Sequence, residues 1–182
     1  MKLFVLLLSL VFFLNGPLLS GQDDKDKSTG NPFKKDQVDL DIEKAVRFLI
    51  SKQKEDGSIH DRGNHTTMTS LALMAMAAVG HQPVNPDDEG EAMQRALDFV
   101  LQKDRQSETG YYGGKDGSRM YGHGITTLML SEMLGMGLDE KQDQKIRDRT
   151  QKAIDLILRS QKVPKSPSHQ GCLLYTSRAH ET

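Results

Sequence analysis

Arg95-Ala96-Leu97-Asp98-Phe99-Val100-Leu101 leads to Gln106 and, after three further residues, to Gly110-Tyr111-Tyr112. The same order occurs earlier in the chain, in Lys44-Ala45-Val46-Arg47-Phe48-Leu49-Ile50, Gln53, Gly57 and Ile59. A third copy starts at Lys152-Ala153 and reaches Gln161. The alanines of the three copies are separated by 51 and then 57 residues. Periods of this size indicate one helical unit that is used several times.

Hydrophobic periodicity around these copies predicts five helices. Apolar residues recur at helical spacing on one side only in residues 38–51, 91–102 and 146–159. Residues 66–79 and 125–134 are apolar on almost every side, which is typical of buried helices. No segment alternates like a half-buried strand. The pattern therefore predicts an all-α protein in which amphipathic outer helices surround apolar inner helices in two concentric layers.

The two ends of the chain are predicted to lie outside this fold. Residues 1–21 have a positive residue, an apolar run and small residues, as in a secretory signal peptide, and residues 22–36 form a polar linker. We expect export to the periplasm or the extracellular space, with an N-terminal membrane anchor as the alternative if the peptide is not cleaved. No stable membrane span is expected after cleavage. Residues 172–182 look like a translated sequencing adapter, which leaves residues 37–171 as a truncated repeat domain.

Charge and cysteine content limit the classes of function. The formal net charge is −1 without a basic block, so no nucleic-acid partner is expected. The only cysteine lies in the adapter-like segment, so no disulfide framework is predicted and the fold must depend on its core.

The repeat resembles the QW repeat of squalene–hopene cyclases and, more broadly, the repeat of terpenoid cyclases and protein prenyltransferase β subunits. The resemblance rests on the basic-Ala-x-x-Phe start and on glutamine followed by glycine and an aromatic residue. Ile59 departs from it, because tryptophan is expected there, and Tyr112 occupies the same position in the second copy. The resemblance implies an α/α toroid of about two and a half repeats. It also implies that Gln53 and Gln106, with Ile59 and Tyr112 as partners, tie the end of an outer helix to the start of the next inner helix.

The resemblance implies little about chemistry. No Asp-x-Asp-Asp acid of the cyclase type is present, and the acids from Asp36 to Asp41 are more simply helix-start residues. The zinc set of the prenyltransferases needs a cysteine, so neither a metal nor another cofactor is predicted, although a histidine and carboxylate group is conceivable. The starts of inner helices converge on one rim of a toroid. The candidate rim residues, which could instead cap helices, are Asp61, His65, Tyr121 and His123, and the conceivable histidine and carboxylate group would come from His60, Asp61, His65 and His123.

Three functions remain open from the sequence. The first is an exported, non-catalytic binding or scaffold toroid whose partner is an apolar small molecule or a protein. The second is a terpene cyclase or prenyltransferase whose catalytic motif lies beyond Gly171. The third is a polysaccharide lyase or hydrolase built on an α/α toroid.

Overall fold

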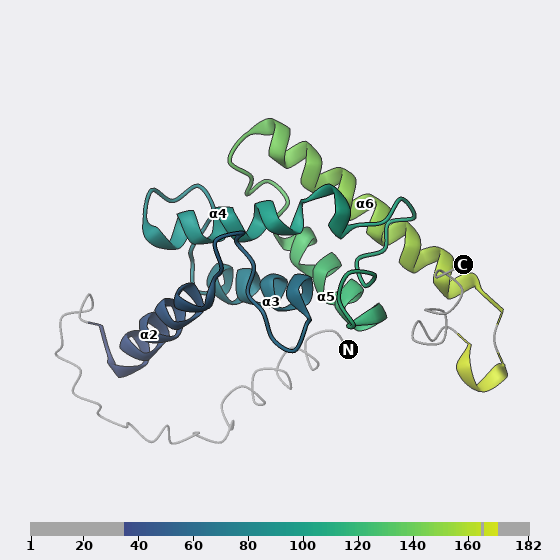
Figure 1. The fold of residues 1–182 in the computed structure, drawn as a ribbon, viewed down its shortest axis with the longest axis horizontal. Coiled ribbons are helices and arrows are strands. Elements are labelled where there is room, and N and C mark those ends of the chain that lie inside the picture. The colour runs from purple at the N-terminus through teal and green to yellow at the C-terminus, as the bar shows by residue number, and fades with distance from the viewer. Residues whose placement is uncertain (1–34, 165, 171–182) are drawn as a thin grey trace, which may run out of the picture. The chain divides into compact units, whose positions relative to one another are not determined.

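The computed structural model describes residues 35–164 and 166–170, and every regular element in this part of the chain is helical (Figure 1). The elements are α2 (Gln37–Lys52), α3 (His65–Ala78), α4 (Asp88–Val100), η1 (Lys103–Arg105), α5 (Arg119–Glu132), α6 (Glu140–Lys162) and η2 (Pro167–His169). The prediction of an all-α chain is thus confirmed for the described residues. The predicted signal peptide, most of the predicted linker and the adapter-like segment lie outside them.

The three amphipathic helices begin in the same way. Asp36, Asp87 and Asp139 are their N-cap residues, and each carboxylate accepts a hydrogen bond from a backbone N–H in the first turn. Asp36 and Asp39 form a reciprocal capping box with N–H to carboxylate distances of 2.9 and 3.0 Å. The acids at the start of α2 therefore satisfy backbone groups that would otherwise lack partners.

The apolar helices α3 and α5 pack against each other and connect the amphipathic helices. α3 also packs against α4, and α5 packs against α6, whereas α2 makes a small contact with α4. The core is formed where these faces meet. Its fully buried side chains are Leu73, Met93, Leu97, Phe99, Leu101, Tyr112, Met129, Leu130, Met133, Ile146 and Leu156.

Burial differs from the sequence expectation in two places. The inner helices were expected to be contacted on all sides, yet Leu71 of α3 and Leu128 of α5 are 40% and 51% exposed. In α2 the apolar side that was expected to be buried is mostly exposed to solvent, and Val46 is the only buried residue of the helix. Periodicity shows which side of a helix is apolar, but it does not show whether a neighbour covers that side.

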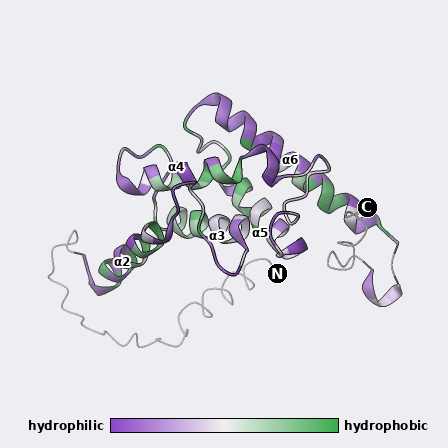
Figure 2. Cartoon of the chain, in the orientation of Figure 1, coloured by the Kyte–Doolittle hydropathy of each residue, from purple (hydrophilic) through white to green (hydrophobic). Residues whose placement is uncertain are grey.

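Two helices start six residues earlier than the sequence suggests, at 119 and 140 instead of 125 and 146. α5 begins at Arg119 and runs through Gly122, where a Cβ atom would overlap the side chains of Thr67 and Ser118. Glycine is tolerated there because it allows α3 and α5 to approach closely. α6 begins at Glu140 with two strongly polar turns, which are mostly hydrophilic in Figure 2. These turns have no apolar periodicity, so the pattern detects the helix only from Ile146.

Candidate functional site

The repeated glutamines make the same set of hydrogen bonds. Gln53 Nε2 donates to the carbonyl oxygens of Gly57 (3.0 Å) and Ala92 (2.8 Å), and its Oε1 accepts from the guanidinium of Arg95 (2.8 Å). One amide side chain thus joins the loop after α2 to the first turns of α4. We call this arrangement the glutamine clamp.

The second copy repeats the clamp one unit further along the chain. Gln106 Nε2 donates to the carbonyl oxygens of Gly110 (3.1 Å) and Arg149 (2.9 Å), and its Oε1 accepts from the Arg149 guanidinium (3.1 Å). Gln106 is buried, with 4% of its surface exposed. Both clamps reach the next amphipathic helix, α4 or α6, whereas the resemblance implied the next inner helix. Besides the loop carbonyl, the carbonyl that each amide reaches belongs to the amphipathic helix, because that helix passes directly over the loop.

The repeated glycines explain this close passage. Gly57 and Gly110 have φ angles of +86° and +99°, which disfavour any residue with a Cβ atom. A Cβ atom on Gly57 would overlap the carbonyl of Arg95, and one on Gly110 would overlap the carbonyl of Lys152. Arg95 and Lys152 are the basic residues that open the following repeat copies. The first copy is therefore locked against the second, and the second against the third, by a glutamine and a glycine.

The positions after the glycines are also fixed in similar ways. The N–H of Ile59 donates to Thr69 Oγ1 of α3 (2.9 Å), and the N–H of Tyr112 donates to His123 Nδ1 of α5 (3.3 Å). These bonds join each loop to the helix that follows it. Neither Ile59 nor the Tyr112 hydroxyl bonds to a clamp glutamine. In the third copy Gln161 is exposed at the end of α6, and no further amphipathic helix follows it among the described residues.

The candidate rim residues do not form one site. Asp61 is exposed and lies 4.0 Å from the Arg62 guanidinium. His65 is the first residue of α3, and its ring centre lies 3.7 Å from that of His60. Tyr121 is 68% exposed in the first turn of α5.

His123 is completely buried and serves the structure of the loop. Its Nδ1 accepts from the Tyr112 N–H, and its Nε2 lies 3.2 Å from the carbonyl oxygen of Ala153. An Nε2–H tautomer satisfies both contacts, and the ring then bridges α5, the preceding loop and α6. It faces Tyr111 and Tyr112 at ring-centre distances of 5.6 and 6.5 Å. The histidine and carboxylate set that includes His123 is thus not assembled.

His60 belongs to a short hydrogen-bonded chain. Ser58 Oγ lies 2.5 Å from both Asp56 Oδ1 and His60 Nε2. Burial and, next, the neighbouring His65 hold the pKa of His60 below its ordinary value, while the Ser58 hydroxyl lowers the pKa of Asp56. Asp56 contacts the serine and not the histidine, and Ser58 is fully buried. The chain therefore lacks both the carboxylate-oriented imidazole and the accessible hydroxyl of a nucleophilic triad.

A polar hollow of about 470 Å³ lies between the loops that precede α3 and α5. Four glycines and the side chains of Lys115, Asp116 and Arg119 line it. Asp116 is 6% exposed and accepts hydrogen bonds from the N–H and hydroxyl of both Thr67 and Ser118. Its charge is therefore compensated by donors inside the protein, which leaves the cations to face the solvent.

Backbone strain is concentrated beside this hollow. Arg62 and Arg119 are the only non-glycine residues with a positive φ in the described part of the chain, at 48° and 53°. Arg62 precedes Gly63, which lines the hollow, and Arg119 lines it directly. Such conformations persist where the surrounding structure holds them, and they are common at ligand sites. No sequence motif pointed to Lys115, Asp116 or Arg119 as functional residues. Only the many glycines of residues 110–117 indicated that a loop precedes α5.

Exposed apolar side chains lie on α3 and α5, and we call Leu71, Tyr121 and Leu128 the apolar stripe. Tyr121 lies two residues after Arg119, and Leu128 follows it after two helical turns on the same side. Leu71 on the adjoining α3 lies two residues before Leu73, as Leu128 lies two residues before Leu130, and both of these later leucines are fully buried. All three apolar side chains are at least 40% exposed. The two helices thus present equivalent apolar positions to solvent, about two helical turns along the chain from residues that line the cationic hollow.

Within residues 35–164 and 166–170, none of the helices has the length and apolar character needed to cross a bilayer. Comparisons with protein-family models, with curated proteins and with solved structures found no match. The arrangement of the clamps, the hollow and the stripe is therefore the basis for a functional assignment.

Proposed function

We propose that the chain is part of an exported, non-catalytic α/α toroid that binds an apolar small molecule with an anionic group. The exposed pair of Leu71 and Leu128, at equivalent positions of two adjoining inner helices, is the observation that carries this proposal. In a closed ring of such units these positions would line the central cavity. A ligand with an apolar body fits this stripe, and an anionic end fits the hollow beside Lys115 and Arg119.

The chemistry of the rim favours binding over catalysis. The buried histidine His123 has both ring nitrogens engaged, and Asp116 is held by four hydrogen bonds. The hydrogen-bonding atoms of both groups are engaged within the protein, whereas a general acid or base must reach a ligand. The only two cationic side chains around the hollow differ in their surroundings: Lys115 lies 3.8 Å from Asp104, whereas Arg119 has no ion pair with a described residue. Arg119 is therefore the residue best placed to meet an anionic group.

The proposal is tested with 8-anilinonaphthalene-1-sulfonate, a fluorescent probe that has an apolar ring system and one sulfonate. We expect saturable binding to the purified chain. Leu71→Asp and Leu128→Asp each place a carboxylate in the stripe, so both should weaken binding by at least about 10-fold. Arg119→Gln should weaken it less, by about 3- to 10-fold, because an exposed charge contact is worth roughly 1 kcal/mol.

Leu158→Asp is the matched control, because Leu158 is 49% exposed but lies on the amphipathic helix α6. It should leave probe binding unchanged. Equal losses in Leu158→Asp and Leu128→Asp would reject the stripe as the binding surface. Circular dichroism of each variant separates a loss of binding from a loss of fold.

A further inference from the structure

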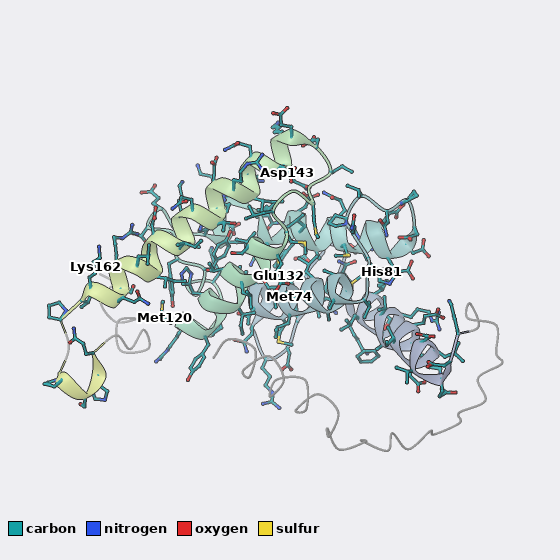
Figure 3. All side chains as sticks on the ribbon, turned by 180° about the vertical axis from the view of Figure 1, so that it is seen from behind. Met74, His81, Met120, Glu132, Asp143 and Lys162 are labelled. Atoms are coloured by element: carbon teal, nitrogen blue, oxygen red, sulfur yellow. The ribbon has the colours of Figure 1, made fainter. Side chains whose placement is uncertain are left out.

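Three potential metal ligands meet at the opposite end of α3 from the rim. His81 follows α3, Asp87 is the N-cap residue of α4, and Glu89 lies in the first turn of α4. One ligand atom from each side chain lies within 4.8 Å of the other two, and this is the one such group in the described ranges. Figure 3 labels His81 beyond the C-terminal end of α3. We call these three residues the loop triad.

The backbone on both sides of the loop triad is fixed. Gly80 has a φ of +95°, and its N–H donates to the carbonyl of Ala77 (3.0 Å) while the N–H of His81 donates to that of Met76 (3.1 Å). This is the Schellman arrangement, which stops α3 and sets the position of His81. At the other side Asp87 Oδ1 accepts from the N–H of Gly90 at 2.8 Å.

The loop of residues 82–86, between His81 and Asp87, is also ordered by contacts with α4 and within itself. A Cβ atom on Gly90 would overlap the carbonyl of Asn85, so the loop lies directly on the first turn of α4. The N–H of Asn85 also donates to the carbonyl of Gln82 at 3.0 Å. The three ligands are therefore carried by backbone that is already ordered, and this reduces the entropic cost of binding an ion.

The local negative charge favours the binding of a cation. Residues 79–91 contain no lysine or arginine, yet they include four carboxylates, those of Asp87, Asp88, Glu89 and Glu91. Glu91 pairs with Arg95 at 3.8 Å. The imidazole of His81 and the carboxylate of Glu89 are both half-buried, and neither bonds to a described residue. Asp87 uses one oxygen for the Gly90 N–H, which leaves the second oxygen available.

We propose that the loop triad binds a zinc ion through His81, Asp87 and Glu89, with water in the fourth position. Acids in a first turn are explained by the helix dipole alone, but that explanation does not account for a histidine brought to them from the end of another helix. One imidazole and two carboxylates suit zinc, whereas magnesium and calcium prefer oxygen ligands throughout. Ligand atoms around tetrahedral zinc lie roughly 3.3 Å apart. The ligand atoms of the loop triad lie within 4.8 Å of one another, so rotation of the three side chains would bring them to this spacing without a change in the backbone.

The ion would cross-link the end of α3 to the start of α4. No cysteine occurs among the described residues, so no disulfide performs this role there. Zinc would bind the folded loop and not the unfolded chain, and it would therefore stabilise the fold in proportion to its concentration.

The test is calorimetric titration of the tag-free, EDTA-treated chain with zinc chloride. We expect one zinc per chain, with a dissociation constant below about 10 μM, and a rise in Tm of about 5 °C at a hundredfold excess over that constant. Magnesium and calcium should produce neither effect. His81→Gln and Glu89→Gln should each weaken zinc binding by at least about 10-fold, because each removes a direct ligand.

Two variants serve as matched controls. Glu91→Gln removes a carboxylate from the same helical turn, and His169→Gln removes a histidine from η2, outside the loop. Both should bind zinc like the parent chain. Zinc affinity that is equal in His81→Gln, Glu89→Gln and the parent, or magnesium affinity that equals zinc affinity, would overturn the proposal. The zinc titration contains no apolar probe, so its outcome is independent of the binding function proposed above.

Discussion

Replacing each clamp glutamine by methionine tests how the repeat stabilises the chain. Methionine keeps most of the side-chain volume and removes the amide. Gln106→Met would delete three hydrogen bonds in a buried setting and leave the carbonyls of Gly110 and Arg149 without this donor. At about 1 kcal/mol for each bond, we expect the free energy of unfolding to fall by about 3 kcal/mol.

The glutamines of the other two copies serve as comparisons, because they are less buried than Gln106. Gln53 makes the same three bonds but is only half-buried, so water can replace the amide, and Gln53→Met should cost about 1–2 kcal/mol. Gln161 is exposed at the end of α6, and Gln161→Met should change the free energy by less than about 0.5 kcal/mol.

Urea unfolding followed by circular dichroism measures these differences. With an m-value of roughly 1.5 kcal/mol/M, the midpoint should fall by about 2 M in Gln106→Met and hardly at all in Gln161→Met. The reasoning is refuted if Gln161→Met destabilises the chain as much as Gln106→Met does, or if all three variants unfold like the parent.

Three further predictions follow from single residues. Gly110→Ala should lower the free energy of unfolding in urea by at least about 2 kcal/mol more than Gly63→Ala does. Both glycines have a positive φ, but only at Gly110 would a Cβ atom overlap a carbonyl. Equal losses of stability would contradict the close passage of α6. Tyr112→Phe should raise the free energy of unfolding by about 1 kcal/mol, since the buried Tyr112 hydroxyl has no hydrogen-bond partner in the described part of the chain; destabilisation in the same assay would reveal a missing partner. The pKa of His60 lies below 6.5 in the folded chain, so between that lowered pKa and 6.5 the unfolded chain binds more protons. The free energy of unfolding should therefore decrease as the pH drops from 7 into this range. In urea titrations at several pH values, His60→Gln should make this decrease smaller. An equal decrease in His60→Gln and the parent chain would count against the lowered pKa of His60.

Much of the helical architecture could be predicted because local patterns determine it. The apolar periodicity located all five α-helices, and the repeated glutamine and glycine marked the crossings between them. The sequence pattern could not show that Gln53 bonds to Ala92 and Arg95 of α4, because the path of the next helix over the loop depends on tertiary packing. It also missed the first turns of α6, where polar residues are held in a helix by the Asp139 cap.

The candidate site was less predictable than the fold. Four rim residues were expected to converge, but side-chain direction separates them: His123 points into the core, whereas Tyr121, two positions earlier, faces solvent. A two-residue step on a helix turns the side chain by about 200°, so neighbours in sequence near a helix start need not share a pocket. The loop triad escaped notice because its ligands are separated by a proline-containing loop whose path the sequence does not specify.

We propose that every copy of the repeat is locked to the following helix by its glutamine, as the Gln53 and Gln106 copies are, and that the copies form a ring whose inner helices face a cavity. A crystal structure of a chain that carries further copies of the repeat after Gly171 tests this proposal most directly. We predict that Gln161 then bonds to a backbone carbonyl of the next amphipathic helix, and that Leu71 and Leu128 point into an enclosed cavity. A structure in which Gln161 stays exposed and the two leucines face bulk solvent would contradict this account.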